Sequence, residues 1–191
     1  KGMAIDKIGR HQEALEAYDK AIKLEPKNSA AWSNKGDWLN KLGQYKEATS
    51  ACQKALEVDS KNASALNNMG YALNNLKEFK KALENLEKAN KLDPNKPIAY
   101  RNKAISLLGL SQPDKALEAV NRAIEIKTDY TLAYVVRAVI YKQTDNKPAM
   151  LEDIKEASKL GLSSQQKGLL KIELFFAPYK DDPRFKKLLE D

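Results

Sequence analysis

The chain repeats itself every 34 residues, and this period constrains its fold more than any other feature. Small residues recur in one column, at Gly2, Gly36, Gly70, Ala104 and Ala138. Large apolar residues recur in the same phase, at Trp32, Leu66, Tyr100 and Tyr134. A period of this length is typical of a solenoid, in which each unit buries its apolar face against the next unit. Such an array presents a long surface, so the sequence favours binding over catalysis.

Each unit contains two amphipathic segments with helical periodicity. In residues 29–42 the apolar Trp32, Leu39 and Leu42 follow helical spacing, Gly43 interrupts the pattern, and residues 45–58 form a second segment. No stretch alternates apolar and polar residues as a strand would. Two helices joined by a short turn pack antiparallel, with axes roughly 8–10 Å apart, and the small columns permit that approach. The sequence therefore predicts an all-α chain of antiparallel helix hairpins.

These columns resemble the tetratricopeptide repeat. The spaced pattern of that family is fullest in two units, with Trp32, Gly36, Leu39, Ala48 and Ala55, and with Leu66, Gly70, Leu73, Phe79, Ala82, Leu86, Ala89 and Pro94. The resemblance covers residues 1 to about 164 and implies a right-handed α-solenoid. Its units are a partial first repeat, 1–28, and the repeats 29–62, 63–96, 97–130 and 131–164.

Residues 165–191 leave the 34-residue period. An open solenoid needs an end-cap, so we expect this segment to form a C-terminal helical cap over the last repeat. The alternative is that Phe175, Phe176 and Tyr179 dock onto another chain, including a second copy of this one.

Two groups of charged residues depart from the family pattern or call for interpretation. Lys35, Lys103 and Arg137 stand where the family usually has leucine, and we expect their aliphatic stems to extend out of the helix seam. The neighbouring acids Glu152 and Asp153 lie beside Lys155 and Glu156, which indicates a solvated helix face.

The net charge of +7 is spread evenly, since each unit contributes +1 or +2. A nucleic-acid-binding protein is expected to gather basic residues into a stripe, so the pattern disfavours an RNA-binding role, which stays as a weaker alternative. No apolar run approaches the roughly 20 residues that a membrane helix needs. We expect a cytoplasmic protein; the chain begins inside a repeat, so its start looks trimmed and leaves room for an upstream targeting segment.

Catalytic, cofactor and metal sites are not predicted. Cys52 is the only cysteine, which leaves no partner for an intramolecular disulfide, and it falls in an apolar column that indicates an inert buried thiol. The sequence contains no glycine-rich phosphate loop, no Ser–His–Asp arrangement and no metal-ligand spacing.

The resemblance implies that the first helix of each unit lines a concave groove, and an asparagine ladder recurs on that helix. Asn34, Asn68 and Asn102 share one phase, and Val136 ends the column. An asparagine amide can hydrogen-bond both backbone groups of a bound peptide. Rungs about 10 Å apart would meet an extended peptide, rising roughly 3.3 Å per residue, at every third residue. The alternative is that these asparagines brace neighbouring repeats.

Neighbouring groove positions would then set selectivity. Asn67 and Tyr71 make the early groove polar, Ile105 and Val136 make the later groove apolar, and Arg101 is suited to a partner's carboxylate. The sequence thus predicts a non-enzymatic scaffold or adaptor that binds a peptide segment of a partner protein. The alternatives are a self-assembling, homo-oligomeric module and an accessory interaction domain of a larger protein.

Overall fold

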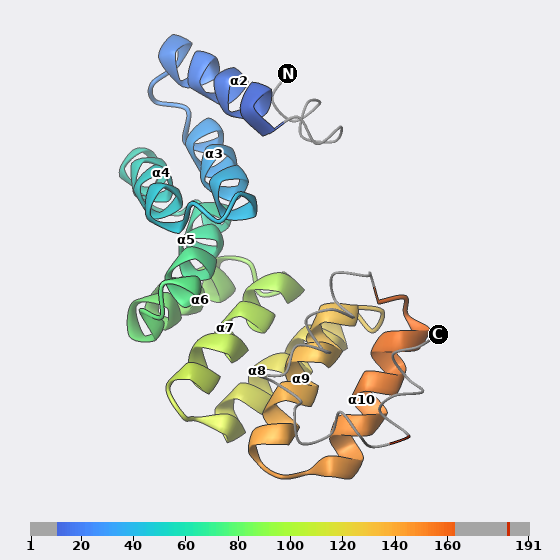
Figure 1. Ribbon diagram of the computed structural model, residues 1–191. Coiled ribbons are helices and arrows are strands. Elements are labelled where there is room, and N and C mark those ends of the chain that lie inside the picture. Colours follow the sequence, from blue (N-terminus) through green and yellow to red (C-terminus); the bar gives the residue numbers. More distant parts are fainter. Residues whose placement is uncertain (1–10, 163–182, 184–191) are drawn as a thin grey trace.

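The computed structural model describes residues 11–162 and Pro183, and the described chain is an array of helices (Figure 1). The first helices of the units are α3 (Ser29–Lys41), α5 (Ala63–Asn75), α7 (Pro97–Gly109) and α9 (Thr131–Gln143). The second helices are α2 (His11–Leu24), α4 (Tyr45–Val58), α6 (Phe79–Leu92), α8 (Pro113–Ile126) and α10 (Lys147–Lys159). The prediction of an all-α solenoid of helix hairpins is confirmed. The predicted cap at 165–191 lies outside the described residues, apart from Pro183.

Asparagine side chains cap the N-termini of the first helices α3 and α5. The Asn28 side chain accepts a hydrogen bond from the Ala31 amide at 2.9 Å, and Asn62 does the same for Ala65 at 2.9 Å. Such caps satisfy amides that the first helical turn leaves without partners. Asn62 also donates to Ser29 Oγ at 2.7 Å, so a cap of one repeat is bonded to the repeat before it.

The turn inside each hairpin requires a left-handed backbone conformation. The residue at this position has φ of 74° at Gly43, 61° at Lys77, 57° at Ser111 and 54° at Asp145. Glycine adopts this conformation without steric cost, whereas a residue with a Cβ does so less readily. The turn geometry therefore repeats even where the glycine does not.

Small residues let the two helices of a hairpin approach closely, as predicted. A Cβ added to Gly36 would lie 2.5 Å from Cys52 Sγ, and one added to Gly70 would lie 2.5 Å from Leu86 Cγ. Both distances are below van der Waals contact, so the glycines are required by the neighbouring helix. In the later repeats Ala104 shares a buried cluster with Val120, and Ala138 shares one with Ile154.

Basic residues of the first helices bridge to the second helix of the preceding repeat. Lys35 pairs with Asp19, and Lys103 Nζ lies 3.2 Å from Glu87 Oε1. These lysines stand where the family pattern has leucine, and their side chains are 23% and 27% exposed. Their ammonium groups reach a specific acid 16 residues earlier, so the column bonds consecutive repeats together.

Among Lys35, Lys103 and Arg137, Arg137 makes the largest set of hydrogen bonds in the described structure. Its guanidinium donates to both carboxylate oxygens of Asp153, at 2.8 and 2.7 Å, and to Asn121 Oδ1 at 2.8 Å. It also lies over the rings of Tyr134 and Tyr141, 5.4 and 6.0 Å from their centroids. The cluster joins three successive helices, α8, α9 and α10.

The interpretation of Asp153 as part of a solvated face is wrong. Its exposed fraction is 4 %, and two of the three corresponding positions are the buried Ala51 and Ala119, the third being the partly exposed Asn85. Burial raises the pKa of its carboxyl above the ordinary value, and the hydrogen bonds from Arg137 oppose that rise. The acid is tolerated there because a bidentate guanidinium pairs with it. Glu152, its neighbour, is exposed as expected.

Gly70→Ala tests the close helix approach. Overpacking typically costs about 1–3 kcal/mol, which outweighs the roughly 1 kcal/mol that alanine gains over glycine in a helix. We expect a lower thermal unfolding midpoint by far-UV circular dichroism. Adding Leu86→Val recreates the native pairing of Ala104 with Val120 and should recover part of the loss. A single variant as stable as wild type would contradict the packing argument.

Arg137→Leu tests the buried ion pair. Removing one partner of such a pair typically costs about 3–5 kcal/mol, because a buried charge is left without compensation. We expect Arg137→Leu to destabilise the protein strongly in denaturant unfolding. The double variant Arg137→Leu, Asp153→Ala removes both charges and should lie much nearer to wild type. If the stability lost in the double variant equals the sum of the losses in Arg137→Leu and Asp153→Ala, the two groups are not coupled.

Candidate functional site

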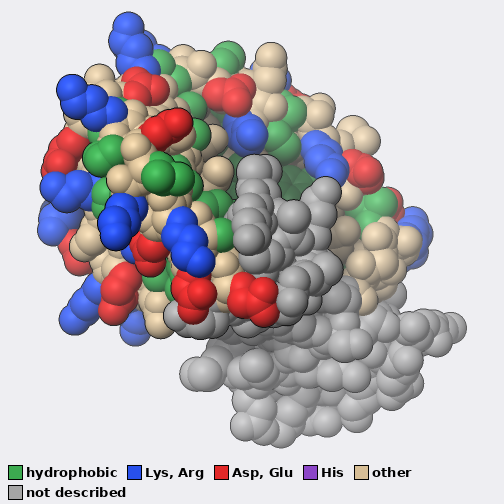
Figure 2. All heavy atoms as spheres, turned by 90° about the horizontal axis from the view of Figure 1, so that it is seen from above, with side chains coloured by type: hydrophobic (Ala, Val, Ile, Leu, Met, Phe, Trp, Pro, Cys, Tyr) green, Lys and Arg blue, Asp and Glu red, His purple; other side chains and the backbone are tan. Residues whose placement is uncertain are grey.

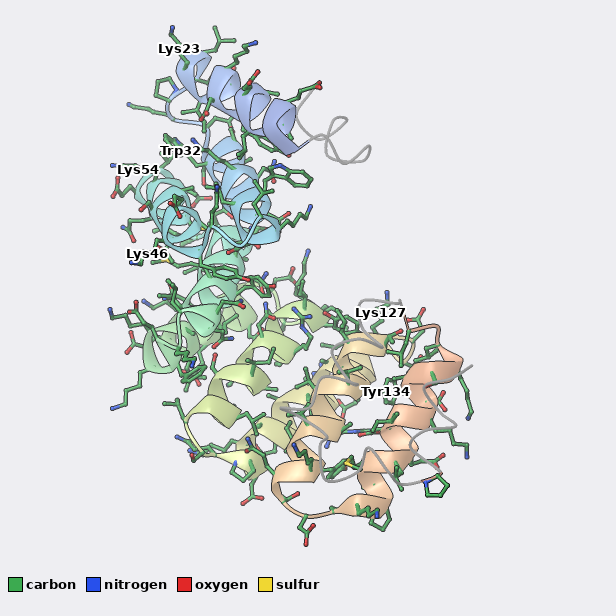
Figure 3. The ribbon with its side chains drawn as sticks, viewed as in Figure 1. Lys23, Trp32, Lys46, Lys54, Lys127 and Tyr134 are labelled. Atoms are coloured by element: carbon green, nitrogen blue, oxygen red, sulfur yellow. The ribbon has the colours of Figure 1, made fainter. Side chains whose placement is uncertain are left out.

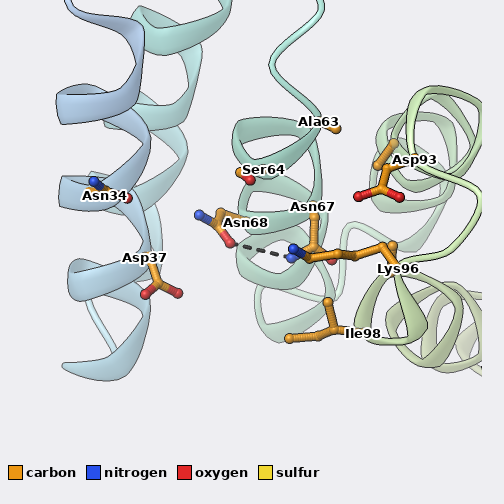
Figure 4. Close-up of a pocket in the computed structure, with 11 residues that line it drawn as sticks. Asn34, Asp37, Ala63, Ser64, Asn67, Asn68, Asp93, Lys96 and Ile98 are labelled. Carbon is orange, nitrogen blue, oxygen red and sulfur yellow. Dashed lines mark hydrogen bonds between the residues drawn. The ribbon is translucent and has the colours of Figure 1, made fainter. Parts of the chain in front are cut away.

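A polar pocket lies between the first helices α3, α5 and α7. Its volume is about 220 Å³, and it is open to solvent in the space between these helices (Figure 4). Its lining side chains are mostly polar or small: Asn34, Asp37, Ala63, Ser64, Asn67, Asn68, Ala89, Asp93, Lys96, Ile98 and Ala99. Three of the predicted groove residues, Asn34, Asn67 and Asn68, are therefore brought together at one site.

Asn34 and Asn68 line the pocket from adjacent first helices, α3 and α5 (Figure 4). Both are partly exposed. Asn68 donates to the Ser33 carbonyl at 3.3 Å and accepts from Asn67 Nδ2 at 3.3 Å, both long hydrogen bonds. No hydrogen bond holds the Asn34 amide within the described part of the chain. Both amides therefore line the pocket and are partly exposed in the described structure.

Asn102 is buried, in contrast to the accessible asparagine ladder predicted from the sequence. Its exposed fraction is 0 %, and both of its amide atoms bond inside the protein. Nδ2 donates to Asn67 Oδ1 at 3.0 Å, and Oδ1 accepts from Arg101 Nη2 at 2.6 Å. At this position the alternative of an asparagine that braces neighbouring repeats describes the structure. Equal phase in the sequence does not make the three asparagines equally accessible.

A second asparagine column bonds consecutive first helices to each other. Asn40 Nδ2 donates to the Asn68 carbonyl at 2.8 Å, and Asn74 Nδ2 donates to the Asn102 carbonyl at 2.9 Å. Ser106 Oγ in turn donates to Asn74 Oδ1 at 2.7 Å. This bracing role was not predicted from the sequence, although the 34-residue spacing of Asn40 and Asn74 indicates that the two asparagines occupy equivalent positions. The same column continues as Leu108, so the polar bracing ends at α7.

The remaining predicted groove residues do not line this pocket. Tyr71 is partly buried and packs edge-on against Tyr45, with ring centroids 6.3 Å apart. Ile105 and Val136 are partly buried, and Val136 packs on the apolar cluster of α7, α8 and α9. Arg101 is buried, with an exposed fraction of 8 %. The polar early groove and apolar later groove stay predictions, because none of these four residues lines the pocket.

Charges are interspersed on the outer surface. Figure 2 shows lysine, arginine and acidic side chains mixed over one face of the molecule. Lys46 and Lys54 of α4 are exposed and project away from the neighbouring helices (Figure 3). Many of these charges pair locally along one helix, as Lys54 does with Glu57 at 2.9 Å. The visible arrangement matches the even charge distribution of the sequence.

Cys52 is the one cysteine of the sequence, and its thiol is buried. Cys52 is fully buried, and burial raises the pKa of its thiol to about 12, so the thiolate is disfavoured at neutral pH. Within the described ranges no cluster of His, Cys, Asp and Glu has the arrangement of a metal site. None of the described helices has both the length and the apolar character needed to cross a bilayer.

Stacked helix hairpins with a pocket between their first helices define the class of helical-repeat proteins. Two tetratricopeptide-repeat family models match, over residues 2–65 and 51–84. The chain is a tetratricopeptide-repeat protein. A comparison with curated protein sequences returned no match.

Solved structures of low identity share this fold. TTC0263, a thermophilic TPR protein of Thermus thermophilus, is 16% identical with a TM-score of 0.78, covering 100% of this chain and 96% of that chain. Pseudomonas aeruginosa pilF is 20% identical with a TM-score of 0.76, covering 98% and 85%. YrrB, described as a TPR protein with an unusual peptide-binding site, is 20% identical with a TM-score of 0.63, covering 92% and 90%.

Asn74→Leu and Asn90→Leu form a matched pair that tests the bracing network. Both asparagines are buried, but Asn74 uses its amide in two hydrogen bonds, whereas neither amide atom of Asn90 has a partner in the described structure. Leaving a buried polar group unpaired costs about 1–3 kcal/mol. We therefore expect Asn90→Leu to stabilise the protein and Asn74→Leu to destabilise it in denaturant unfolding.

The Asn90 variant is also favoured by the repeat itself, because Leu56 and Ile124 occupy the same phase. Equal losses in both variants would contradict the distinction between a bonded and an unbonded asparagine.

Proposed function

We propose that the chain is a non-enzymatic scaffold that binds an extended segment of a partner protein in the groove over α3, α5 and α7. The observation that supports this most is the pocket that Asn34 and Asn68 line together from adjacent helices. Each amide offers one acceptor and two donors, which suits the N–H and C=O groups of a peptide backbone. Contacts of this kind give affinity without reading sequence.

The geometry of the repeat supports an extended ligand. Neighbouring first helices lie roughly 8–10 Å apart, which is about three residues of extended chain. A peptide crossing from Asn34 to Asn68 would therefore present equivalent backbone groups to both amides. YrrB, which shares the fold, is described as having a peptide-binding site. Homo-oligomerisation and a cytoplasmic location stay predictions.

Alanine variants of Asn34 and Asn68 test this proposal. Peptides are selected from a displayed random library on the wild-type protein, synthesised, and titrated by fluorescence anisotropy. Each lost hydrogen bond is worth about 1 kcal/mol, so Asn34→Ala and Asn68→Ala should each weaken binding by roughly fivefold or more. Asn34→Ala is the cleaner variant, because Asn68 also bonds to Ser33 and Asn67.

Asn85→Ala is the matched control. Asn85 lies on the second helix α6, and its amide bonds within that helix, to the Lys81 carbonyl at 2.8 Å. The affinity of the Asn85→Ala protein for the selected peptides should equal that of the wild-type protein. Failure to select any peptide, or peptides that bind Asn34→Ala and Asn68→Ala as well as wild type, would overturn the proposal.

A further inference from the structure

A second pocket, separate from the groove pocket, lies between α6, α7 and α8. Its volume is about 280 Å³, and the two pockets have no lining residue in common. On α7 it is lined by Tyr100, Lys103 and Leu107, which follow helical spacing and share one face of that helix. Ile98, which lines the groove pocket, lies roughly half a turn around the helix from Tyr100. The second pocket therefore opens between the second helices α6 and α8, away from the proposed peptide groove.

The base of this second pocket is apolar and its rim is charged. Leu107 and Ala119 are buried, and Leu83 is partly buried. The charged lining residues are Glu87, Lys103, Lys115, Glu118 and Arg122. Three of these are basic and two are acidic, and Glu87 already pairs with Lys103 at 3.2 Å. An apolar base under a rim with a positive balance suits an apolar group that has a negative charge beside it.

The next repeat shows which groups fill the equivalent space. Tyr100, Lys103, Leu107 and Ala119 of the pocket correspond, 34 residues later, to Tyr134, Arg137, Tyr141 and Asp153. There the Asp153 carboxylate accepts two hydrogen bonds from Arg137, whose guanidinium lies near both tyrosine rings. A tyrosine ring and a carboxylate thus stand, within the fold itself, at the positions of the smaller Leu107 and Ala119.

The rim also differs in charge between the two repeats. Lys115 and Arg122 stand where the next repeat has Ala149 and Glu156. The pocket therefore has two more basic residues than its counterpart, and it lacks the acid that pairs inside that counterpart. Both differences favour an acidic group supplied from outside this repeat.

The size of the pocket suits one side chain of a partner protein. Pockets for small molecules are usually about 300–1,000 Å³ and cover most of the surface of their ligand. This pocket is smaller, and its rim residues Lys115 and Arg122 are exposed. Single aromatic side chains that enter such pockets are common anchors of protein interfaces.

We propose that this pocket is a second docking site, which binds an aromatic side chain of a partner protein together with a neighbouring Asp or Glu of that partner. The ring packs on Leu83, Leu107 and Ala119, and the acid lies beside the basic rim. The site is independent of the groove, so one chain can bind two segments at once.

A variant with a filled pocket tests the site. A displayed library of random peptides is selected on Asn34→Ala, Asn68→Ala, in which groove binding is weakened. Adding Lys103→Arg and Ala119→Asp to this parent recreates the pairing of Arg137 with Asp153 inside the pocket. We expect peptides that bind the parent and lose at least tenfold in affinity on the filled variant, and these should be enriched in an aromatic residue next to Asp or Glu.

Synthetic peptides with both ends blocked test the charge contact by fluorescence anisotropy, since blocking removes the terminal carboxylate. Lys115→Gln in the parent should weaken binding by roughly threefold, as expected for an exposed ion pair. Changing the acid of the peptide to its amide should have the same effect on the parent and little further effect on Lys115→Gln.

Lys81→Gln is the matched control. Lys81 occupies the position 34 residues before Lys115, lies exposed on α6 and pairs with Glu78 at 2.6 Å, but it lines neither pocket. Lys81→Gln should bind every selected peptide as the parent does.

Thermal unfolding by circular dichroism checks the filled variant, whose midpoint should lie near that of its parent because both partners of the new pair are present. Should the filled variant unfold, the Lys115→Gln cycle decides. Peptides that bind the filled, folded variant as tightly as the parent, or that bind Lys115→Gln and the parent equally, would overturn the inference. Selection of no peptide on the parent would overturn it as well. The proposed function is tested separately, by peptides selected on the wild-type protein, so it stands in each of these cases.

Discussion

The close crossing of the two helices in each hairpin is the contact on which the rest of the array depends. At Gly36 and Gly70 a methyl group would collide with a side chain of the facing helix, and in the later repeats the column holds only the methyl groups of Ala104 and Ala138. Because the same crossing recurs every 34 residues, each unit presents a similar first helix to its neighbour. The groove is a consequence of that regular stacking and needs no residues of its own to form.

Two different kinds of interaction join successive first helices along this regular array. From α3 to α7 the contact is polar, since Asn40 and Asn74 donate across it to main-chain carbonyls. From α7 onward it is apolar, and Val136 and Ile140 pack into one cluster with residues of α7 and α8. A directional hydrogen bond fixes the register of two helices more narrowly than apolar packing does. The pocket lies in the polar half, where the helices that line it are held in register.

The helices were predictable because they depend on local spacing, whereas the site depended on partners distant in sequence. The second segment, 45–58, matches α4, since apolar periodicity and the turn at Gly43 determine it. The depth of Asn102 depends on Asn67, 35 residues earlier, and the burial of Asp153 depends on Arg137. Residues spaced 34 apart in the sequence share the same face of their helices. The spacing does not say how closely the neighbouring helix covers each of those residues.

Arg101 and Arg137 show two different ways in which the described fold holds the guanidinium of a largely buried arginine. Both are arginines on first helices and both lie near tyrosine rings. Arg137 has its carboxylate within the fold, so its charge is part of what joins the helices. Arg101 donates to a neutral amide, which orients the guanidinium but does not neutralise it.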